Sequence, residues 1–188
     1  MRDSLSSLLD ADGHLYVFAY GSLMWRPGFR PAGGHPALLR GWHRAFCILS
    51  RHHRGTPDRP GLVLGLDRGG ACRGIAWRVA AAEAAEVLAA LDARELVAGE
   101  YHRRVVPVTL LDSGARKRAI AYVADRSAPS YAPRLPPEEM ARRIAGARGH
   151  FGSNRAYLHA TARQLAALGV QDRRIAQLAA LCPLPEEA

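Results

Sequence analysis

The chain has 188 residues, nearly half of them apolar (48%), so it is long enough to bury one sizeable core. We expect a single domain over residues 1–188, with its core between about residues 15 and 182. The formal charge of +9 comes almost entirely from scattered arginines, with Lys117 the only lysine, and this distribution argues against a nucleic-acid partner. The short apolar patch near the start is not typical of a secretory signal, and no apolar run is long enough for a membrane span. We therefore expect neither nucleic acid nor membrane as a partner.

The first predicted element is a strand at Leu15–Ala19, an apolar run rich in aromatic and branched residues. It stops at Tyr20-Gly21-Ser22, where the glycine favours a sharp turn. Three further strands are then expected at residues 45–49, 62–66 and 74–79. Turns rich in Gly and Pro separate them, including one at Gly69-Gly70.

The second half of the chain is predicted to contain more helix. An alanine-rich helix is expected at about 81–93, followed by strands at 102–111 and 119–123 that a turn at Asp112-Ser113-Gly114 joins as a hairpin. A proline-rich connection then leads to three helices, around 138–144, from about 154 to 169 with Ser153 or Asn154 as N-cap, and from about 172 to 182. Strands first and helices last indicate an α+β fold.

Glu95 is the most informative polar residue. Continuing the apolar stripe of the predicted helix from Leu88 and Leu91 by four residues leads to Glu95, so a carboxylate lies where a core residue is expected. Burial raises the pKa of such a carboxyl and makes it a better proton acceptor at neutral pH. The alternative is an exposed Glu95 at a frayed helix end, paired with Arg94 or Arg103.

The turn after the first strand is the second candidate site. Successive backbone N–H groups in Tyr20-Gly21-Ser22-Leu23 can converge on an anion or a carboxylate. Glycine and serine after a strand also form ordinary turns, so this pattern alone leaves both interpretations open.

Other candidate chemical groups are less informative. Cys47, Cys72 and Cys182 are widely spaced and form no zinc or redox motif, which favours a reducing compartment and a cytoplasmic location. Each is expected to be a small buried hydrophobe, with a catalytic thiol as the alternative. His52 and His53 are adjacent and point to opposite faces of a strand, so we expect no metal site there.

Five blocks of sequence, in order, resemble a known family. They are Tyr20-Gly21-Ser22-Leu23-Met24-Trp25; Arg44-Ala45-Phe46-Cys47; Arg54-Gly55-Thr56 with Pro60-Gly61; Arg94-Glu95 with Gly99 and Tyr101; and Gly149-His150-Phe151-Gly152-Ser153-Asn154 with Tyr157-Leu158. Their order and spacing are similar to those of the ChaC-type glutathione-specific gamma-glutamylcyclotransferases, and the resemblance covers roughly residues 16–171.

This resemblance implies a small mixed β-barrel flanked by helices, a single catalytic glutamate at Glu95, and no metal or organic cofactor. Tyr101 is a candidate for a further hydrogen bond to the substrate, and a packing role for it is equally open. One departure is Ala19, which stands where a glycine often precedes the tyrosine of the turn. The implied substrate-binding loop consists of Ala19, Tyr20, Gly21, Ser22, Leu23 and Met24.

The implied activity is cleavage of glutathione to 5-oxoproline and Cys-Gly, with the α-amine of the substrate as nucleophile. This reaction needs no enzyme nucleophile, in keeping with a chain that has no convincing Ser-His-Asp or Cys-His arrangement. The alternatives are the same reaction on another gamma-glutamyl amine or dipeptide, a basic binding module without catalysis, and a thiol hydrolase that uses Cys47. The sequence leaves the oligomeric state unknown.

Overall fold

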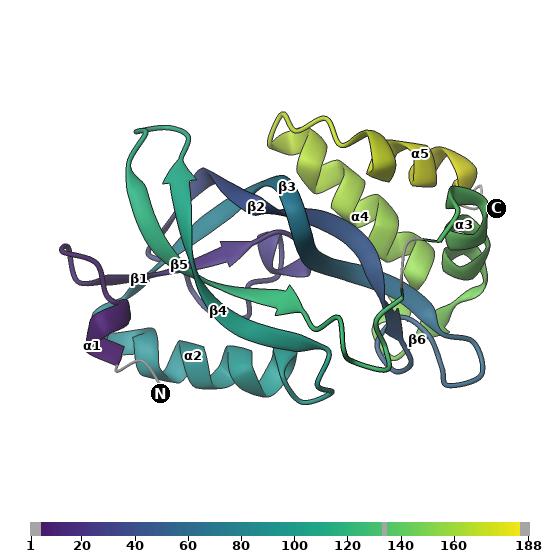
Figure 1. Cartoon of the computed structure of the whole chain (residues 1–188), viewed down its shortest axis with the longest axis horizontal. Coiled ribbons are helices and arrows are strands. Elements are labelled where there is room, and N and C mark those ends of the chain that lie inside the picture. Colours follow the sequence, from purple (N-terminus) through teal and green to yellow (C-terminus); the bar gives the residue numbers. More distant parts are fainter. Residues whose placement is uncertain (1–4, 133–134, 185–188) are drawn as a thin grey trace. The chain divides into compact units, whose positions relative to one another are not determined.

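The computed structural model describes residues 5–132 and 135–184. The elements follow an α+β order, as expected (Figure 1). They are α1 (Leu5–Leu8), β1 (His14–Ala19), the 3-10 turn η1 (Ser22–Met24), β2 (Gly33–Ser50), β3 (Gly61–Ala80), α2 (Ala81–Glu95), β4 (Tyr101–Leu110), β5 (Arg116–Ala124), α3 (Pro137–Gly146), β6 (Arg148–Gly149), β7 (Gly152–Ser153), α4 (Asn154–Ala167) and α5 (Arg173–Leu181).

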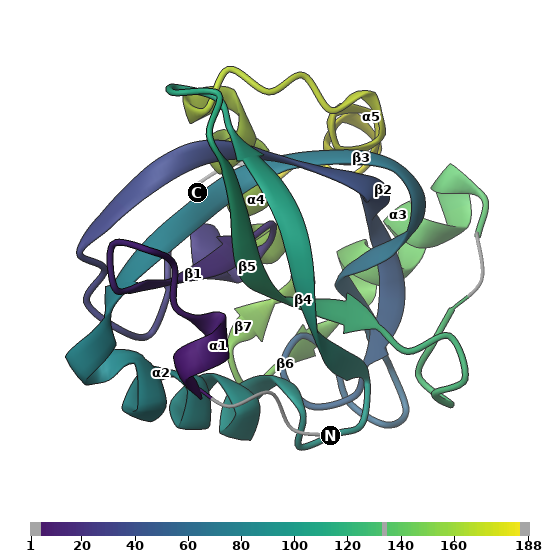
Figure 2. The same ribbon diagram turned by 60° about the vertical axis from the view of Figure 1, so that its left-hand side comes forward.

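The five long strands form a closed barrel in the order β1-β3-β2-β4-β5. β1 pairs antiparallel with β3 and parallel with β5, so the barrel is mixed. β4 and β5 form an antiparallel hairpin over nine residue pairs, from Tyr101 opposite Ala124 to Thr109 opposite Arg116 (Figure 2). The expected small mixed barrel is therefore confirmed.

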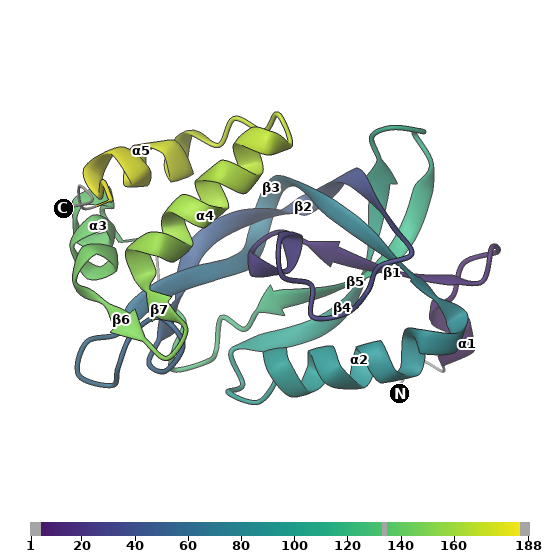
Figure 3. The ribbon, with the colours of Figure 1, turned by 180° about the vertical axis from the view of Figure 1, so that it is seen from behind.

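The chain divides into two compact units, and β2 and β3 each run through both. The first unit consists of Met1–Arg44 and Leu66–Asp125, and α2 packs along β1 within it (Figures 1 and 3). Every residue of the candidate site described below belongs to this first unit.

The second unit consists of Ala45–Gly65 and Arg126–Ala188, and α3, α4 and α5 pack against one another within it (Figure 3). Asn154, the first residue of α4, is fully buried and binds both backbone polar groups of Leu62: its Oδ1 accepts from the N–H at 2.6 Å and its Nδ2 donates to the C=O at 2.7 Å. Ser153 is the N-cap of α4, because its side chain accepts a hydrogen bond from the N–H of Ala156.

Two strand predictions were incomplete or wrong. The expected strands at 62–66 and 74–79 are one continuous strand, β3, so the predicted turn at Gly69-Gly70 is wrong. Both glycines have a positive φ, 97° and 70°, which allows a local distortion of the strand without ending it.

The first two thirds of β2 were missed, because Gly34 and Pro36 are not typical strand residues. Glycine at position 34 is required by packing, since a Cβ there would overlap the ring of Trp77 on β3. The apolar pattern of the local sequence does not reveal this close approach, which only the paired strand creates.

Candidate functional site

Glu95 is the last residue of α2, one turn beyond the buried Leu91. Its side chain is only 18% exposed, so the predicted half-buried carboxylate is confirmed. Burial raises the pKa of the Glu95 carboxyl above its ordinary value, and the positive charge of Arg94 lowers it in part. The ion pair with Arg94 also forms, with 3.1 Å between Nε and Oε1, whereas Arg103 pairs with Asp92 instead. Glu95 is thus both half-buried and paired.

The turn after β1 is a short 3-10 helix. The N–H of Met24 donates to the C=O of Gly21 at 2.9 Å, and the N–H of Arg26 donates to the C=O of Ser22 at 2.8 Å. The first N–H groups of any helical turn have no partner inside it, and here they belong to Ser22 and Leu23. The turn therefore presents two adjacent backbone donors that its own hydrogen bonds do not use.

The side chains of the predicted loop are mostly buried. Tyr20, Leu23 and Met24 are 2 to 6% exposed, and Ala19 is fully buried at the end of β1. These side chains pack inside the first unit, so a ligand at this turn would contact its backbone and the half-exposed Ser22.

Two side chains from neighbouring strands hold the turn. Arg44 on β2 is buried, and its Nε donates to the C=O of Tyr20 at 2.6 Å. Trp77 on β3 donates from its indole Nε1 to the C=O of Leu23 at 2.9 Å. The sequence pointed to Arg44 only as part of a family block and missed Trp77, because an alternating strand pattern does not reveal which backbone group a side chain will meet.

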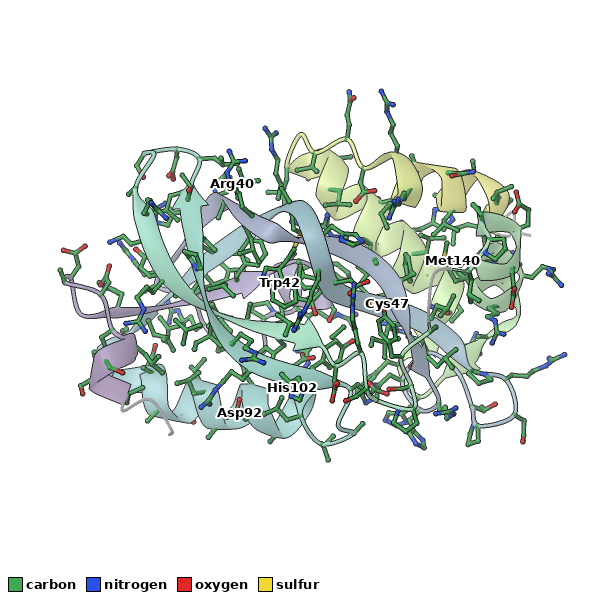
Figure 4. The ribbon with its side chains drawn as sticks, viewed as in Figure 1. Arg40, Trp42, Cys47, Asp92, His102 and Met140 are labelled. Atoms are coloured by element: carbon green, nitrogen blue, oxygen red, sulfur yellow. The ribbon has the colours of Figure 1, made fainter. Side chains whose placement is uncertain are left out.

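A second network fixes α2 against β5. The hydroxyl of Tyr20 donates to the C=O of Tyr122 at 2.8 Å, and the hydroxyl of Tyr122 donates to Asp92 Oδ1 at 2.8 Å. Asp92 also forms an ion pair with Arg103 of β4, and Figure 4 labels Asp92 on α2. Burial, and then the hydrogen bond to Asp92, raise the pKa of Tyr122 far above its ordinary value, so this hydroxyl stays protonated. In the sequence, Asp92 was marked only by its position about one helical turn before Glu95.

Arg94 connects the two predicted parts of the site. Its Nη2 donates to Ser22 Oγ at 2.9 Å and its Nη1 donates to the C=O of Arg26 at 3.1 Å, while its Nε contacts Glu95. The turn after β1 and the carboxylate at the end of α2 therefore meet at one guanidinium group. Sequence reasoning treated Arg94 only as a possible partner of Glu95 and did not foresee its contact with the turn.

Tyr101 is the first residue of β4, in register with Ala124 of β5, and is half-buried. A five-residue turn separates it from Glu95, and Gly99 in this turn has a φ of 67°. The next residue, His102, is labelled in Figure 4, and its Nε2 lies 3.1 Å from Asp125 Oδ2.

The remaining candidates lie elsewhere. The three cysteines are all buried free thiols, which fits the expectation of small buried hydrophobes. Across residues 5–132 and 135–184, no three His, Cys, Asp or Glu side chains gather in a group able to hold a metal ion. None of the helices in this same part of the chain is long and apolar enough to cross a membrane.

Comparison with known proteins identifies the family of this chain. The sequence model of the ChaC-like protein family matches residues 15–183. The chain belongs to the ChaC-like family. A curated relative from Escherichia coli, named glutathione-specific gamma-glutamylcyclotransferase, is 35% identical over 161 residues, which cover 86% of this chain and 69% of the relative.

A second curated relative and a solved structure are also similar to this chain. The human glutathione-specific gamma-glutamylcyclotransferase 1 is 34% identical over 169 residues, which cover 87% of this chain and 76% of the relative. The crystal structure of a gamma-glutamyl cyclotransferase specific to glutathione from yeast aligns with a TM-score of 0.80 at 20% identity, over 93% of this chain and 100% of that one. At this identity the structural likeness shows a shared fold.

Proposed function

We propose that the chain is a glutathione-specific gamma-glutamylcyclotransferase that releases 5-oxoproline and Cys-Gly. Membership of the ChaC-like family and the names of its relatives support this reaction. The observation that carries the proposal is the half-buried carboxylate of Glu95, joined through Arg94 to a turn whose own hydrogen bonds leave two backbone N–H groups unused. This arrangement suits a reaction that needs one proton carrier and a fixed substrate but no enzyme nucleophile.

In the proposed reaction the α-amine of the gamma-glutamyl group attacks its own γ-carbonyl carbon. The new C–N bond closes the five-membered ring of 5-oxoproline, and the C–N bond to the cysteine residue breaks. Glu95 accepts a proton from the attacking amine and returns it to the departing nitrogen of Cys-Gly. One carboxylate serves both steps, because the proton that leaves the first nitrogen is the one that the second nitrogen gains.

The raised pKa of Glu95 suits this double role. A carboxyl whose pKa lies closer to neutral pH is a stronger base when it is ionised, and near neutral pH it can both gain and release a proton. The base must be ionised for the first step, so kcat/KM is expected to rise as the pH passes upward through the raised pKa of Glu95.

The turn after β1 is proposed to hold the gamma-glutamyl end. The N–H groups of Ser22 and Leu23, together with the backbone of Gly21, would bind a carboxylate of the substrate. This contact would keep the flexible glutamyl chain folded with amine and carbonyl close, which raises the effective concentration of the nucleophile. Tyr101 is proposed to hydrogen-bond the substrate or to pack beside it.

We propose that the buried residues of the loop stabilise the turn that makes this contact. Ala19, Tyr20 and Met24 keep the turn in place through packing, and Tyr20 also through its hydroxyl and carbonyl hydrogen bonds. We further infer a cytoplasmic location, because the reducing conditions there keep glutathione and the three free thiols of this chain reduced.

The direct test is incubation of the purified protein with reduced glutathione and quantification of 5-oxoproline and Cys-Gly by mass spectrometry. The proposal expects both products in a 1:1 ratio. A gamma-glutamyl dipeptide and a gamma-glutamyl amine are assayed in parallel. Turnover of either without turnover of glutathione would replace the substrate but keep the reaction, and no 5-oxoproline from any of the three would refute the function.

A further inference from the structure

The guanidinium of Arg94 contacts three groups from separate parts of the first unit. These are the carboxylate of Glu95 at 3.1 Å, the hydroxyl of Ser22 at 2.9 Å and the backbone C=O of Arg26 at 3.1 Å. The guanidinium is planar and presents its N–H groups in a fixed fork. A single rigid group therefore sets the Glu95 carboxylate and the segment that contains Ser22 at defined positions relative to each other.

The contact between Arg94 and Glu95 is not an ordinary pair on a helix surface. Neighbouring residues on an α-helix point about 100° apart and do not normally face each other. Here the far end of the Arg94 side chain is bound by Ser22 and by the C=O of Arg26, and this brings its Nε beside Glu95. The pair thus depends on the turn after β1 as well as on α2.

We propose that Arg94 is a positioning residue for the cyclotransfer reaction, whose guanidinium holds the carboxylate of Glu95 and the Ser22–Met24 turn in one arrangement. This inference rests on the proposed function, because it assigns the turn to substrate binding and Glu95 to proton transfer. Loss of the contact would leave both groups present but free to move relative to each other. Misplacement on the scale of 1 Å lowers catalytic rates by about 100-fold in well-positioned sites.

Arg94 also acts on the charge of Glu95. Its guanidinium lowers the pKa that burial raises, so a neutral residue at position 94 would raise the pKa of Glu95 further. On β5, Tyr122 stays neutral, and the charge of Glu95 contributes to raising the pKa of Tyr122. Asp92 and Arg103 form an ion pair beside Tyr122 and largely balance each other. Burial therefore sets the direction in which the pKa of Glu95 moves, and the charge at position 94 limits how far it rises.

Two substitutions at position 94 separate its charge from its geometry. Arg94→Gln removes the charge, so the acid limb of the kcat/KM profile is expected to move to higher pH. Arg94→Lys keeps the charge but cannot span three partners, so the acid limb is expected to stay in place while kcat/KM at its plateau falls by about 10-fold or more. Arg142→Gln, an exposed arginine on α3, is the matched control for loss of one positive charge and should change neither quantity.

Ser22→Ala tests the link to the turn. It removes one of the three contacts of Arg94, so kcat/KM is expected to fall without a shift of the acid limb. Because Ser22 and Arg94 share one hydrogen bond, the losses in a Ser22→Ala/Arg94→Gln double variant should be clearly less than additive. Additive losses, or wild-type kcat/KM in Arg94→Lys, would overturn the positioning role.

A second readout does not depend on turnover of glutathione. The pKa of Glu95 is measured directly by NMR titration of its carboxyl carbon in the wild type and in both Arg94 variants. It is expected to rise in Arg94→Gln and to stay close to wild type in Arg94→Lys, and equal values in all three proteins would overturn the electrostatic role.

If the wild type does not cleave glutathione, the proposed function fails, while the titration still reports whether Arg94 controls the pKa of Glu95. Should Arg94→Gln not fold, the Lys variant and the Ser22→Ala variant decide the matter.

Discussion

Replacement of Glu95 by glutamine separates the chemistry of the proposed site from its shape. Glutamine has nearly the same size as glutamate but cannot accept a proton at neutral pH. Positioned general acid and base catalysis contributes about 100- to 10,000-fold to a rate, so kcat is expected to fall by that factor in Glu95→Gln. Glu86→Gln is the matched control, because Glu86 is exposed on the same helix, and its kcat should equal that of wild type.

The same substitution has a predictable effect on stability. Burial raises the pKa of Glu95 in the folded state, so its ionised form is less stable there than in the unfolded chain. A pKa difference of 1 between the folded and unfolded states changes the free energy of unfolding by about 1.4 kcal/mol. The stability that this raised pKa contributes is fully present below the pKa of Glu95 in the unfolded chain, and it is lost as the pH rises through the pKa of Glu95 in the folded state. Above the folded pKa, the variant avoids the cost of the buried charge, so Glu95→Gln should be at least as stable as wild type at pH 8.

The assay combines glutathione turnover with urea unfolding of both proteins at a series of pH values from 5 to 8. The stability advantage of Glu95→Gln should shrink as the pH falls, because Glu95 becomes protonated in the folded wild type. Near-normal turnover by the folded variant would refute the assignment of Glu95 as the proton carrier. A variant clearly less stable than wild type at pH 8 would refute the reasoning from burial.

Three further substitutions test the supports of the site and of the fold, each by urea unfolding. Tyr20→Phe loses one buried hydrogen bond to β5, so it should cost about 1 kcal/mol and retain activity within a few-fold of wild type. Gly74→Ala places a Cβ against the C=O of Ala19, so overpacking should cost about 1–3 kcal/mol and disturb the start of the turn. Asn154→Ala leaves both backbone groups of Leu62 unpaired in the second unit, at a cost of about 2–4 kcal/mol.

The control for Gly74→Ala is a second glycine, and the other two variants have results that would contradict their assigned roles. Gly114→Ala lies in the open hairpin turn, where an added Cβ meets no neighbour but φ is 73°, so it tests backbone strain without overlap. Loss of activity in Tyr20→Phe at unchanged stability would mean that its hydroxyl contacts the substrate. An Asn154→Ala protein as stable as wild type would contradict the role of its amide as the partner of Leu62.

Much of the proposed site follows from local sequence. The phase of the apolar stripe at Leu88 and Leu91 predicts a half-buried Glu95, and the structure confirms it. Gly21 and Ser22 after an apolar strand predict a turn, and the turn forms. These features depend on residues within one helical turn or one strand end, so neighbouring residues suffice to specify them.

Other features depend on pairing between distant segments. The sequence splits β3 at Gly69-Gly70, yet the strand continues, because its partners in the barrel provide hydrogen bonds that local turn preference does not outweigh. The first part of β2 was also missed, because Gly34 is locally a poor strand residue, and only pairing with β3 brings the ring of Trp77 so close that position 34 requires a glycine.

The difference between what the local sequence predicts and what the tertiary structure decides is clearest at Arg94. Sequence alone determined that a cation stands next to Glu95 and that the family blocks occur in order, and it predicted that the carboxylate lies on the apolar face of a helix. Only the tertiary structure decided that Arg94 reaches Ser22, a residue 72 positions earlier, and so joins the carboxylate to the turn. The physical reason is range: periodicity and turn chemistry act over a few residues, whereas a hydrogen bond between segments forms only when closure of the barrel brings α2 and the end of β1 together.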